Sequence, residues 1–154
     1  MNISKTGVIS KYEESFLQYL AGFTDADGNL DFSIRGSKNS FHFLAKWTVS
    51  QKDPWVLRTI KRDLGIGWLY KNKSDQWFLE VSGPKATQLI YQLYPYLVLK
   101  QQRATFITKH SNYLKLTKEE ALRIRNEFLT IEQEANPSLY SVPWLAGFFD
   151  GDGY

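Results

Sequence analysis

A nine-residue motif occurs twice in this chain, and the distance between its copies limits the possible folds more than any other feature. Residues 20–28 read LAGFTDADG and residues 145–153 read LAGFFDGDG, with seven of the nine positions identical. The copies begin 125 residues apart (145 minus 20), which is the length of a small domain. This spacing predicts one structural repeat followed by the opening of a second.

Each copy of the motif is predicted to form the end of a helix. Gly22 and Ala26 lie four residues apart, as do Gly147 and Gly151, so each pair shares one helical face. Small residues on one face allow two helix backbones to approach closely. We therefore expect these four residues to form the interface between two paired helices.

The second acidic residue of each copy, Asp27 or Asp152, precedes a glycine. Gly28 and Gly153 are expected to end the helices in the left-handed conformation. A carboxylate at the negative end of a helix dipole is disfavoured by about 0.3 to 1 kcal/mol. If the helices pair in parallel, the two carboxylates also repel each other. A divalent cation between them would relieve both costs, so the sequence predicts a metal site.

The composition narrows the chemistry of that site. The chain has no cysteine and two histidines, which argues against a thiolate site, a cysteine nucleophile or a histidine-based zinc centre. Carboxylates remain as ligands, and these suit magnesium or calcium. The formal net charge is +3, which neither requires nor excludes a nucleic-acid partner.

The chain carries no sign of a membrane partner. No apolar run approaches the roughly 18 residues of a transmembrane helix. Residues 1–12 lack both the hydrophobic block of a signal peptide and the arginines of a transit peptide. We expect a soluble protein that works in the compartment where it is made.

The hydrophobic pattern predicts a mixed helix and sheet domain. Alternating apolar and polar residues indicate antiparallel hairpins with one buried and one polar face. The predicted strand pairs are 29–35 with 41–50, and 68–72 with 76–82. The predicted helices are 12–26, 53–64, 84–93, 99–114 and 117–135. This order gives an α/β (α+β) unit with an antiparallel sheet.

The motif and the order of the elements together resemble the LAGLIDADG homing endonuclease family. The first copy departs from the family name only at Phe23 and Thr24. The resemblance implies an αββαββα unit, with a saddle-like antiparallel sheet packed under helices. It also implies a site-specific endonuclease whose partner is double-stranded DNA with a long recognition site. In that family two motif helices form the interface between two domains or two subunits.

The resemblance suggests a division of the chain into parts. Residues 1–11 are expected to be a flexible N-terminus, 12–114 a first domain, 115–141 a linker with a helix, and 142–154 the motif helix of a second repeat. The chain thus resembles a two-motif enzyme truncated early in its second repeat. A second copy of the chain or a missing C-terminal domain would complete it.

The resemblance is compatible with DNA cleavage by this chain alone and with cleavage only together with a second unit. Two alternatives to cleavage are an intron RNA maturase and a DNA-binding module without cleavage. Because family members are often encoded in organelle introns, the resemblance also implies a chloroplast or mitochondrion as the host compartment.

The resemblance assigns roles to the motif residues. Asp27 and Asp152 match the family's metal-binding acids, with the backbone carbonyls of Ala26 and Gly151 nearby. The implied ion is Mg²⁺, whereas Ca²⁺ would occupy the site without supporting cleavage. Asp25 lies on another side of the helix, where a structural hydrogen bond or a charge on the rim is expected.

Two further residues match the family's supporting positions around the attacking water. Gln51 follows the second predicted strand, and Lys100 lies at the start of the predicted helix 99–114. Alternative interpretations stay open for both, namely a strand-end amide at the rim for Gln51 and a solvated lysine at a helix start for Lys100.

Base and phosphate contacts are expected from the polar faces and turns of the two hairpins, because a two-stranded ribbon fits the major groove. The predicted DNA-binding residues are Asn29, Asp31, Ser33, Arg35, Lys38, His42, Lys46, Thr48, Tyr70, Asn72, Lys73, Gln76 and Glu80. Leu44 and Phe78 interrupt this polar face. Contact with a thymine methyl group and packing in the core are the two interpretations that stay open for them.

Overall fold

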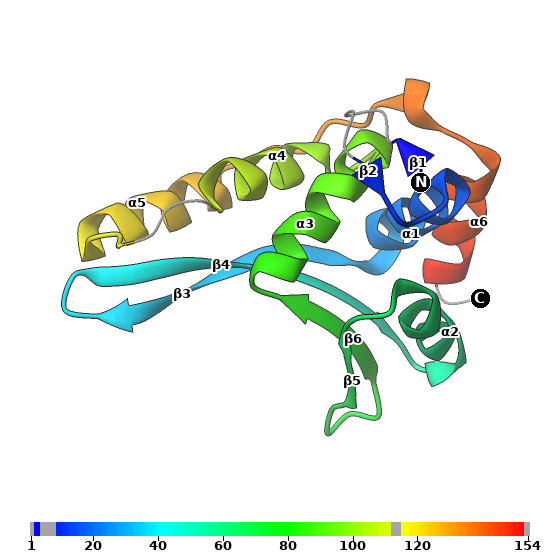
Figure 1. Ribbon diagram of the computed structural model, residues 1–154, viewed down its shortest axis with the longest axis horizontal. Coiled ribbons are helices and arrows are strands. Elements are labelled where there is room, and N and C mark those ends of the chain that lie inside the picture. The colour runs from blue at the N-terminus through cyan, green and yellow to red at the C-terminus, as the bar shows by residue number, and fades with distance from the viewer. Residues whose placement is uncertain (1, 4–8, 112–114, 153–154) are drawn as a thin grey trace.

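The computed structural model describes residues 2–3, 9–111 and 115–152 of the chain (Figure 1). The elements, in chain order, are β1 (Asn2–Ile3), β2 (Ile9–Ser10), α1 (Glu14–Asp27), β3 (Asn29–Ser37), β4 (Ser40–Gln51), α2 (Pro54–Leu64), β5 (Trp68–Lys71), β6 (Trp77–Ser82), α3 (Pro84–Leu93), η1 (Tyr94–Tyr96), α4 (Gln101–His110), α5 (Lys118–Leu129), η2 (Pro137–Leu139) and α6 (Val142–Gly151). The predicted α+β class is confirmed.

The central sheet is antiparallel and has the strand order β3-β4-β6-β5. One face of it carries the buried side chains, among them Leu30, Trp47 and Leu79. Helices α3, α4 and α5 lie above the long β3–β4 hairpin in Figure 1, and the β5–β6 hairpin turns downward away from them. The two hairpins therefore present their polar faces on the side opposite these helices.

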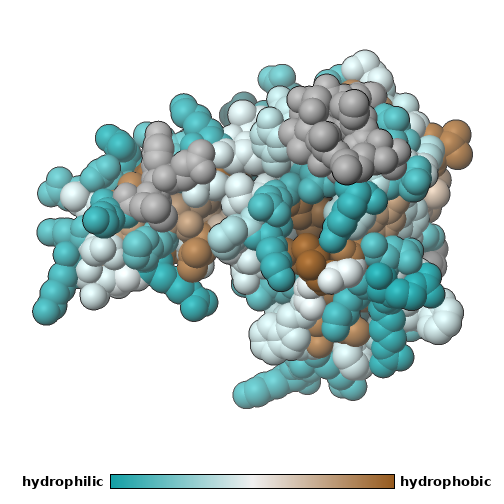
Figure 2. All heavy atoms as spheres, viewed as in Figure 1, coloured by the Kyte–Doolittle hydropathy of each residue, from teal (hydrophilic) through white to brown (hydrophobic). Residues whose placement is uncertain are grey.

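The two hairpins end in hydrophilic turns. Figure 2 shows hydrophilic side chains projecting from the far end of the long hairpin and from the tip of the short one. The long hairpin closes more tightly than the predicted turn at 36–40, because only Lys38 and Asn39 separate its strands. Both residues have positive φ, at 52° and 61°, as a two-residue type I′ turn requires.

Two helices begin at the caps that the sequence predicts, whereas α1 begins at Glu14, two residues after its predicted start at 12. Asp53 caps α2 by accepting from Trp55 N at 2.9 Å, and Thr117 opens α5 with a complete capping box. The helix predicted to run to residue 135 ends at Leu129. The chain leaves it and returns to the core, where Asn136 N donates to the carbonyl of Val98 at 2.9 Å.

Only parts of the N-terminal segment, and one of the two final motif glycines, Gly28 and Gly153, lie within the described residues. β1 and β2 pair antiparallel, while residues 1 and 4–8 of the predicted flexible N-terminus lie outside the described residues, as does Gly153. The prediction that Gly28 is left-handed is wrong, because its φ is −84° and its ψ is 163°. Glycine is required there by space, since a Cβ would lie 2.7 Å from the Cα of Thr24.

No helix among residues 2–3, 9–111 and 115–152 is long and apolar enough to cross a membrane.

Helices α1 and α6 lie side by side with their backbones in contact, at one end of the long hairpin (Figure 1). A Cβ added to Gly22 would lie 1.9 Å from the carbonyl oxygen of Trp144, and one added to Gly147 would lie 1.9 Å from that of Tyr19. Gly151 in turn faces Ala26, since a Cβ added to Gly151 would lie 3.0 Å from the Cβ of Ala26. The four small residues of the motif therefore form the interface between the two helices.

The contacts between α1 and α6 are reciprocal. Trp144 Nε1 donates to Asp25 Oδ2 at 2.9 Å, and Tyr19 OH donates to Asp150 Oδ2 at 2.7 Å. Adding the repeat spacing of 125 to 19 and 25 gives 144 and 150, so each contact is the counterpart of the other. The two motif helices are thus related by an approximate two-fold axis, as in a self-complementary interface.

The helix contact gives a testable prediction about stability. Gly22→Ala and Gly147→Ala should each lower the free energy of unfolding by about 3 kcal/mol or more, since the added methyl group has no space between the two backbones. Urea denaturation measures the change. Ser15→Ala, on the exposed side of α1, is the control and should change stability by less than about 0.5 kcal/mol. A Gly22→Ala protein as stable as the control would contradict the helix contact.

Candidate active site

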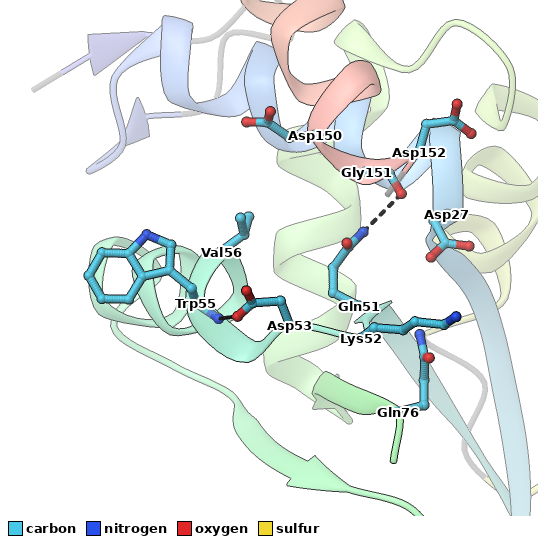
Figure 3. A pocket seen from close by; sticks show the side chains of 10 residues that line it. All are labelled: Asp27, Gln51, Lys52, Asp53, Trp55, Val56, Gln76, Asp150, Gly151 and Asp152. Atoms are coloured by element: carbon cyan, nitrogen blue, oxygen red, sulfur yellow. Dashed lines mark hydrogen bonds between the residues drawn. The ribbon is translucent and has the colours of Figure 1, made fainter. Parts of the chain in front are cut away.

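The ends of α1 and α6 meet over the end of β4 and form a cleft. Its lining residues are Asp27, Gln51, Lys52, Asp53, Trp55, Val56, Gln76, Asp150, Gly151 and Asp152. Figure 3 shows the side chains of Asp27 and Asp152 on the same side of this cleft, with the carboxylate of Asp150 directed away from them. The helix contact therefore brings together two predicted site residues that lie 125 positions apart in the sequence.

Asp27 is the last residue of α1 and lies at the rim of the cleft. Ser50 Oγ donates to its Oδ2 at 3.3 Å. Partial burial raises the pKa of Asp27, and the charge of Asp152 raises it further, while Ser50 and the ammonium of Lys100 oppose the rise. This effect of Asp152 agrees with the repulsion between the two carboxylates that the motif predicts for paired helix ends.

Gln51 joins the sheet to the second motif helix. Its Nε2 donates to the carbonyl oxygen of Gly151 at 2.9 Å (Figure 3). This contact fixes the carbonyl beside the two carboxylates. Gln51 is the half-buried last residue of β4, as the interpretation of a strand-end amide at the rim expects, and its bond to Gly151 links it to the second motif helix.

Lys100 lies against the end of α1 and not in solvent. Its Nζ donates to the carbonyl of Thr24 at 2.7 Å and to that of Gly28 at 2.5 Å. Burial lowers the pKa of Lys100, and the charge of Asp25 opposes that change. A cation at this position compensates the negative end of the helix dipole next to Asp27. The interpretation of Lys100 as a solvated lysine is therefore wrong.

Asp25 is a structural residue. It is 4% exposed, and its carboxylate accepts from the backbone nitrogens of Val98 and Lys100, at 2.7 and 3.0 Å, as well as from Trp144. Burial raises the pKa of Asp25, and these donors oppose the rise. Asp25 thereby fixes the segment that places Lys100 under α1, which agrees with the structural hydrogen bond expected for it.

The predicted DNA-binding residues lie in rows across the polar face of the sheet. Asn29 is opposite Thr48, Asp31 opposite Lys46, Ser33 opposite Leu44, and Arg35 opposite His42. On its other side, Thr48 is opposite Glu80 of β6. The sheet therefore aligns these side chains on one surface, and Gln76, just before β6, also lines the cleft.

Some of these side chains already have partners within the chain. Lys46 Nζ lies 2.9 Å from Glu80, and this hydrogen bond raises the pKa of Lys46. The amide oxygen of Asn72 accepts from Ser74 N and Gln76 N, which shapes the turn of the short hairpin. Lys73 lies exposed in the same turn, and Lys38 in the turn of the long hairpin.

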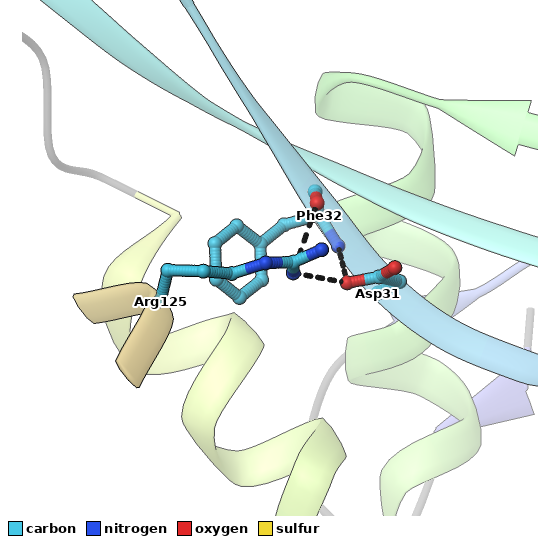
Figure 4. A network of polar contacts seen from close by, with 3 residues as sticks. All are labelled: Asp31, Phe32 and Arg125. Carbon is cyan, nitrogen blue, oxygen red and sulfur yellow. Dashed lines mark hydrogen bonds and ion pairs between the residues drawn. The ribbon is translucent and has the colours of Figure 1, made fainter. Parts of the chain in front are cut away.

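One contact on this face comes from a residue that the sequence did not single out. Arg125 of α5 donates to Asp31 Oδ1 at 2.6 Å and to the carbonyl of Phe32 at 3.4 Å, and its guanidinium lies 4.8 Å from the ring of Phe32 (Figure 4). The ion pair ties α5 to β3 at the edge of the sheet. Its partners are 94 residues apart, and no local pattern marks them.

The groups at this site that could bind a metal ion are mainly oxygen atoms. Among the described residues, no group of three or more histidine, cysteine, aspartate or glutamate side chains could hold a metal ion. Asp27 and Asp152 form a pair, with the Gly151 carbonyl close by. Such a set suits a hard cation that keeps waters or takes further oxygens from a bound phosphate.

A family profile and two related proteins all indicate one family of endonucleases. A family profile described as LAGLIDADG endonuclease matches residues 20–120. The chain is 31% identical to the probable intron-encoded endonuclease Cox1-I1b of Schizosaccharomyces pombe, over 90% of this chain and 41% of that protein. It is 30% identical to the DNA endonuclease I-CreI of Chlamydomonas reinhardtii, over 71% of each chain. The chain thus spans less than half the length of the first of these relatives.

Solved structures show the same fold. The homing endonuclease I-CvuI, solved with DNA in the presence of Mg and of Ca, superposes with a TM-score of 0.57 at 25% identity, over 73% of this chain and 74% of that one. The LAGLIDADG meganuclease I-CpaMI, bound to uncleaved DNA, superposes with a TM-score of 0.63 at 20% identity, over 88% of this chain and 57% of that one.

The repulsion between the two motif acids gives a prediction about pH. In the metal-free chain, Asp152→Asn should lower the pKa of Asp27, because it removes a negative charge that disfavours ionisation. A carbon-detected NMR titration of the Asp27 carboxyl measures the change. Asp150→Asn, which keeps an acceptor for Tyr19, should leave the Asp27 pKa where it was. An Asp27 pKa that stays the same or rises in Asp152→Asn would contradict the proximity of the two acids.

The separate tasks of Asp25 and Asp27 give a prediction about stability. Asp25→Asn should lower the free energy of unfolding by about 1–3 kcal/mol, because an amide NH₂ would face at least one of three buried donors. Asp27→Asn, the matched change two residues later, should leave stability unchanged or raise it by relieving repulsion. Thermal unfolding compares the two. Equal losses from both variants would contradict the assignment.

Proposed function

The chain belongs to the LAGLIDADG endonuclease family, and we propose that it forms one half of a site-specific endonuclease that cuts double-stranded DNA with Mg²⁺. The observation that carries the proposal is the meeting of Asp27 and Asp152 in one cleft, at the ends of two helices in backbone contact. The proposed cut is made where these helix ends face the DNA. The intron origin in the name of the S. pombe relative supports a homing role, and with it an organellar host compartment.

The donor set fits magnesium. The two carboxylates repel each other across the cleft, and partial burial opposes the ionisation of Asp27, so a divalent cation would stabilise both charges. In the proposal Asp27 and Asp152 hold the ion, with the carbonyls of Ala26 and Gly151 as nearby oxygens. Ca²⁺ would occupy the same ligands without supporting cleavage. Bound Mg²⁺ would polarise the scissile phosphate and lower the pKa of a water molecule.

The remaining residues of the site would position these ligands. Ser50 holds one carboxylate oxygen of Asp27, and Gln51 holds the Gly151 carbonyl. Lys100 neutralises the end of α1, so that a carboxylate is tolerated there. We assign Gln51 and Lys100 as positioning residues for the attacking water and the phosphate, in place of direct contact with the ion.

The polar face of the sheet is the proposed DNA-binding surface. A two-stranded antiparallel ribbon fits the major groove, and side chains such as Asn29, Arg35, His42 and Thr48 project from one face of such a ribbon. Exposed Lys38 and Lys73 and their neighbours at the turns suit phosphates. Asp31 and Glu80 are paired with cations of this chain, so in the proposal they orient Arg125 and Lys46 at the DNA surface.

The outer side of α6 is left uncovered by the described residues. Val142, Leu145 and Phe149 form an apolar stripe on its outer side and are 80%, 43% and 61% exposed. Subtracting 125 gives their counterparts on α1, Leu17, Leu20 and Thr24, which are 1%, 0% and 0% exposed.

We propose that a second unit packs on this stripe in the way that the sheet and helices of residues 12–114 pack on α1. Residues 115–141 would then connect the two units, and 142–154 would belong to the second. A second copy of the chain or a further domain could fill that place.

The proposal is tested with a randomised duplex library. We expect the chain to select a defined duplex in Ca²⁺, and in Mg²⁺ to produce new ends clustered at one site. Asp27→Asn and Asp152→Asn should lower the cutting rate by about 100-fold or more while binding in Ca²⁺ persists, because the ion contributes several kcal/mol to the transition state. Sequencing of the ends and a filter-binding assay give the two readouts.

Asp150→Asn is the matched control, since its carboxylate is bonded to Tyr19 and directed away from the pair (Figure 3). It should cut as the unchanged chain does. Undiminished cutting by Asp27→Asn would overturn the roles of the acids, and failure to select any duplex would overturn the DNA-binding proposal. A palindromic selected site, with a dimer mass by light scattering, would identify a second copy as the second unit. Selection in Ca²⁺ without ends in Mg²⁺ would assign the chain alone to binding.

A further inference from the structure

Three aromatic side chains gather on the short hairpin, outside the core. Trp68 and Tyr70 come from β5 and Phe78 from β6, and we call them the aromatic platform. The ring centroids of Trp68 and Tyr70 are 4.8 Å apart, and those of Tyr70 and Phe78 are 5.3 Å apart. Trp68 is 64% exposed, and the other two are half-buried.

The register of the sheet places the platform on the polar face. Tyr70 is opposite Phe78, which is opposite Ser50, and Trp68 is opposite Glu80, which is opposite Thr48. Side chains alternate between the two faces of a strand, and the intervening Leu79 is fully buried on the helix side. The platform therefore lies on the same surface as the proposed base-reading side chains.

The surroundings of the platform are close to neutral. Glu80, its neighbour on β6, is paired with Lys46 at 2.9 Å. An exposed tryptophan beside two more rings, on a face built mostly of polar residues, is suited to an apolar partner group. In duplex DNA the major groove offers one such group, the C5-methyl of thymine, and the minor groove offers none.

The geometry of the rings favours methyl contact over base stacking. Tyr70 and Phe78 are nearly parallel, with 15° between their planes, and they stack on each other. Stacking platforms for single-stranded nucleic acid need ring faces that are open to successive bases. Here Tyr70 and Phe78 cover one face of each other. Their exposed edges and the indole of Trp68 form a small apolar surface.

The position of the platform also indicates where in the target it acts. Phe78 is paired across the sheet with Ser50, which donates to Asp27. Neighbouring strands are about 4.8 Å apart, so Tyr70 lies roughly 10 Å from that point, a distance of about three base pairs along DNA.

Resting on the proposed function, namely binding of duplex DNA, we propose that the platform of Trp68, Tyr70 and Phe78 reads thymine methyl groups in the major groove within a few base pairs of the cut. It would be a determinant of target specificity beside the polar contacts. Phe78 is half-buried, so packing in the core does not account for all of its surface.

The test replaces single thymines by deoxyuridine, which removes the methyl group and leaves the hydrogen-bonding edge intact. In the duplex selected in Ca²⁺, the replacement should weaken binding by about 3- to 10-fold at one to three positions near the cut, and little elsewhere. In Trp68→Ala this difference between thymine and uracil should shrink to below about 2-fold at one or more of those positions. Fluorescence anisotropy measures both.

Tyr91→Ala is the matched control, because it removes an exposed aromatic ring from α3, in the helix layer. It should keep the full response to uracil. Melting temperatures check that both variants fold, and the 64% exposure of Trp68 makes a large loss of stability unexpected.

Three outcomes would overturn the inference. A selected duplex that tolerates uracil at every position would do so, as would a Trp68→Ala protein with an unchanged response. Preferential binding of single-stranded RNA, with Trp68 required, would assign the platform to base stacking. Failure to select any duplex would instead be a failure of the proposed function, so the two are distinguishable.

Discussion

The backbone contact between α1 and α6 is the constraint on which the rest of the structure depends. Gly22 and Gly147 each lie where a methyl group would overlap a carbonyl of the other helix. This close approach brings the ends of the helices together, and with them Asp27 and Asp152. A wider helix pair would separate the carboxylates, and Gln51 could no longer reach the Gly151 carbonyl. The glycines of the motif thus contribute to the site by allowing the short distance between the two helices.

The two aspartates within one motif have different tasks. Asp25 is buried and organises residues 98–100 by accepting from their backbone, which brings Lys100 under the end of α1. Asp27, two residues later, faces the cleft. In the second motif, Asp150 corresponds to Asp25 but is exposed and bonded to Tyr19. The difference between these corresponding residues is what a missing second unit would produce, and it supports the proposal of one.

Local signals in the sequence predicted much of the fold. The alternation in residues 29–50, the caps at Asp53 and Thr117 and the spacing of small residues in the motif all act over a few residues, and the structure agrees with them. The contacts that sequence analysis did not predict join residues far apart in the chain. Lys100 contacts a carbonyl 76 residues away, and Arg125 pairs with Asp31 across 94 residues. No period or cap in the sequence reports such contacts.

The central claim, that Asp27 and Asp152 hold one divalent cation, is tested most directly by Mn²⁺ added in small amounts to the ¹⁵N-labelled chain. Paramagnetic broadening of amide signals reports proximity to the bound ion, even when binding is weak. The account predicts broadening centred on residues 26–28 and 151–152, and its loss in Asp27→Asn. Broadening centred elsewhere, or a pattern that Asp27→Asn leaves unchanged, would contradict the account.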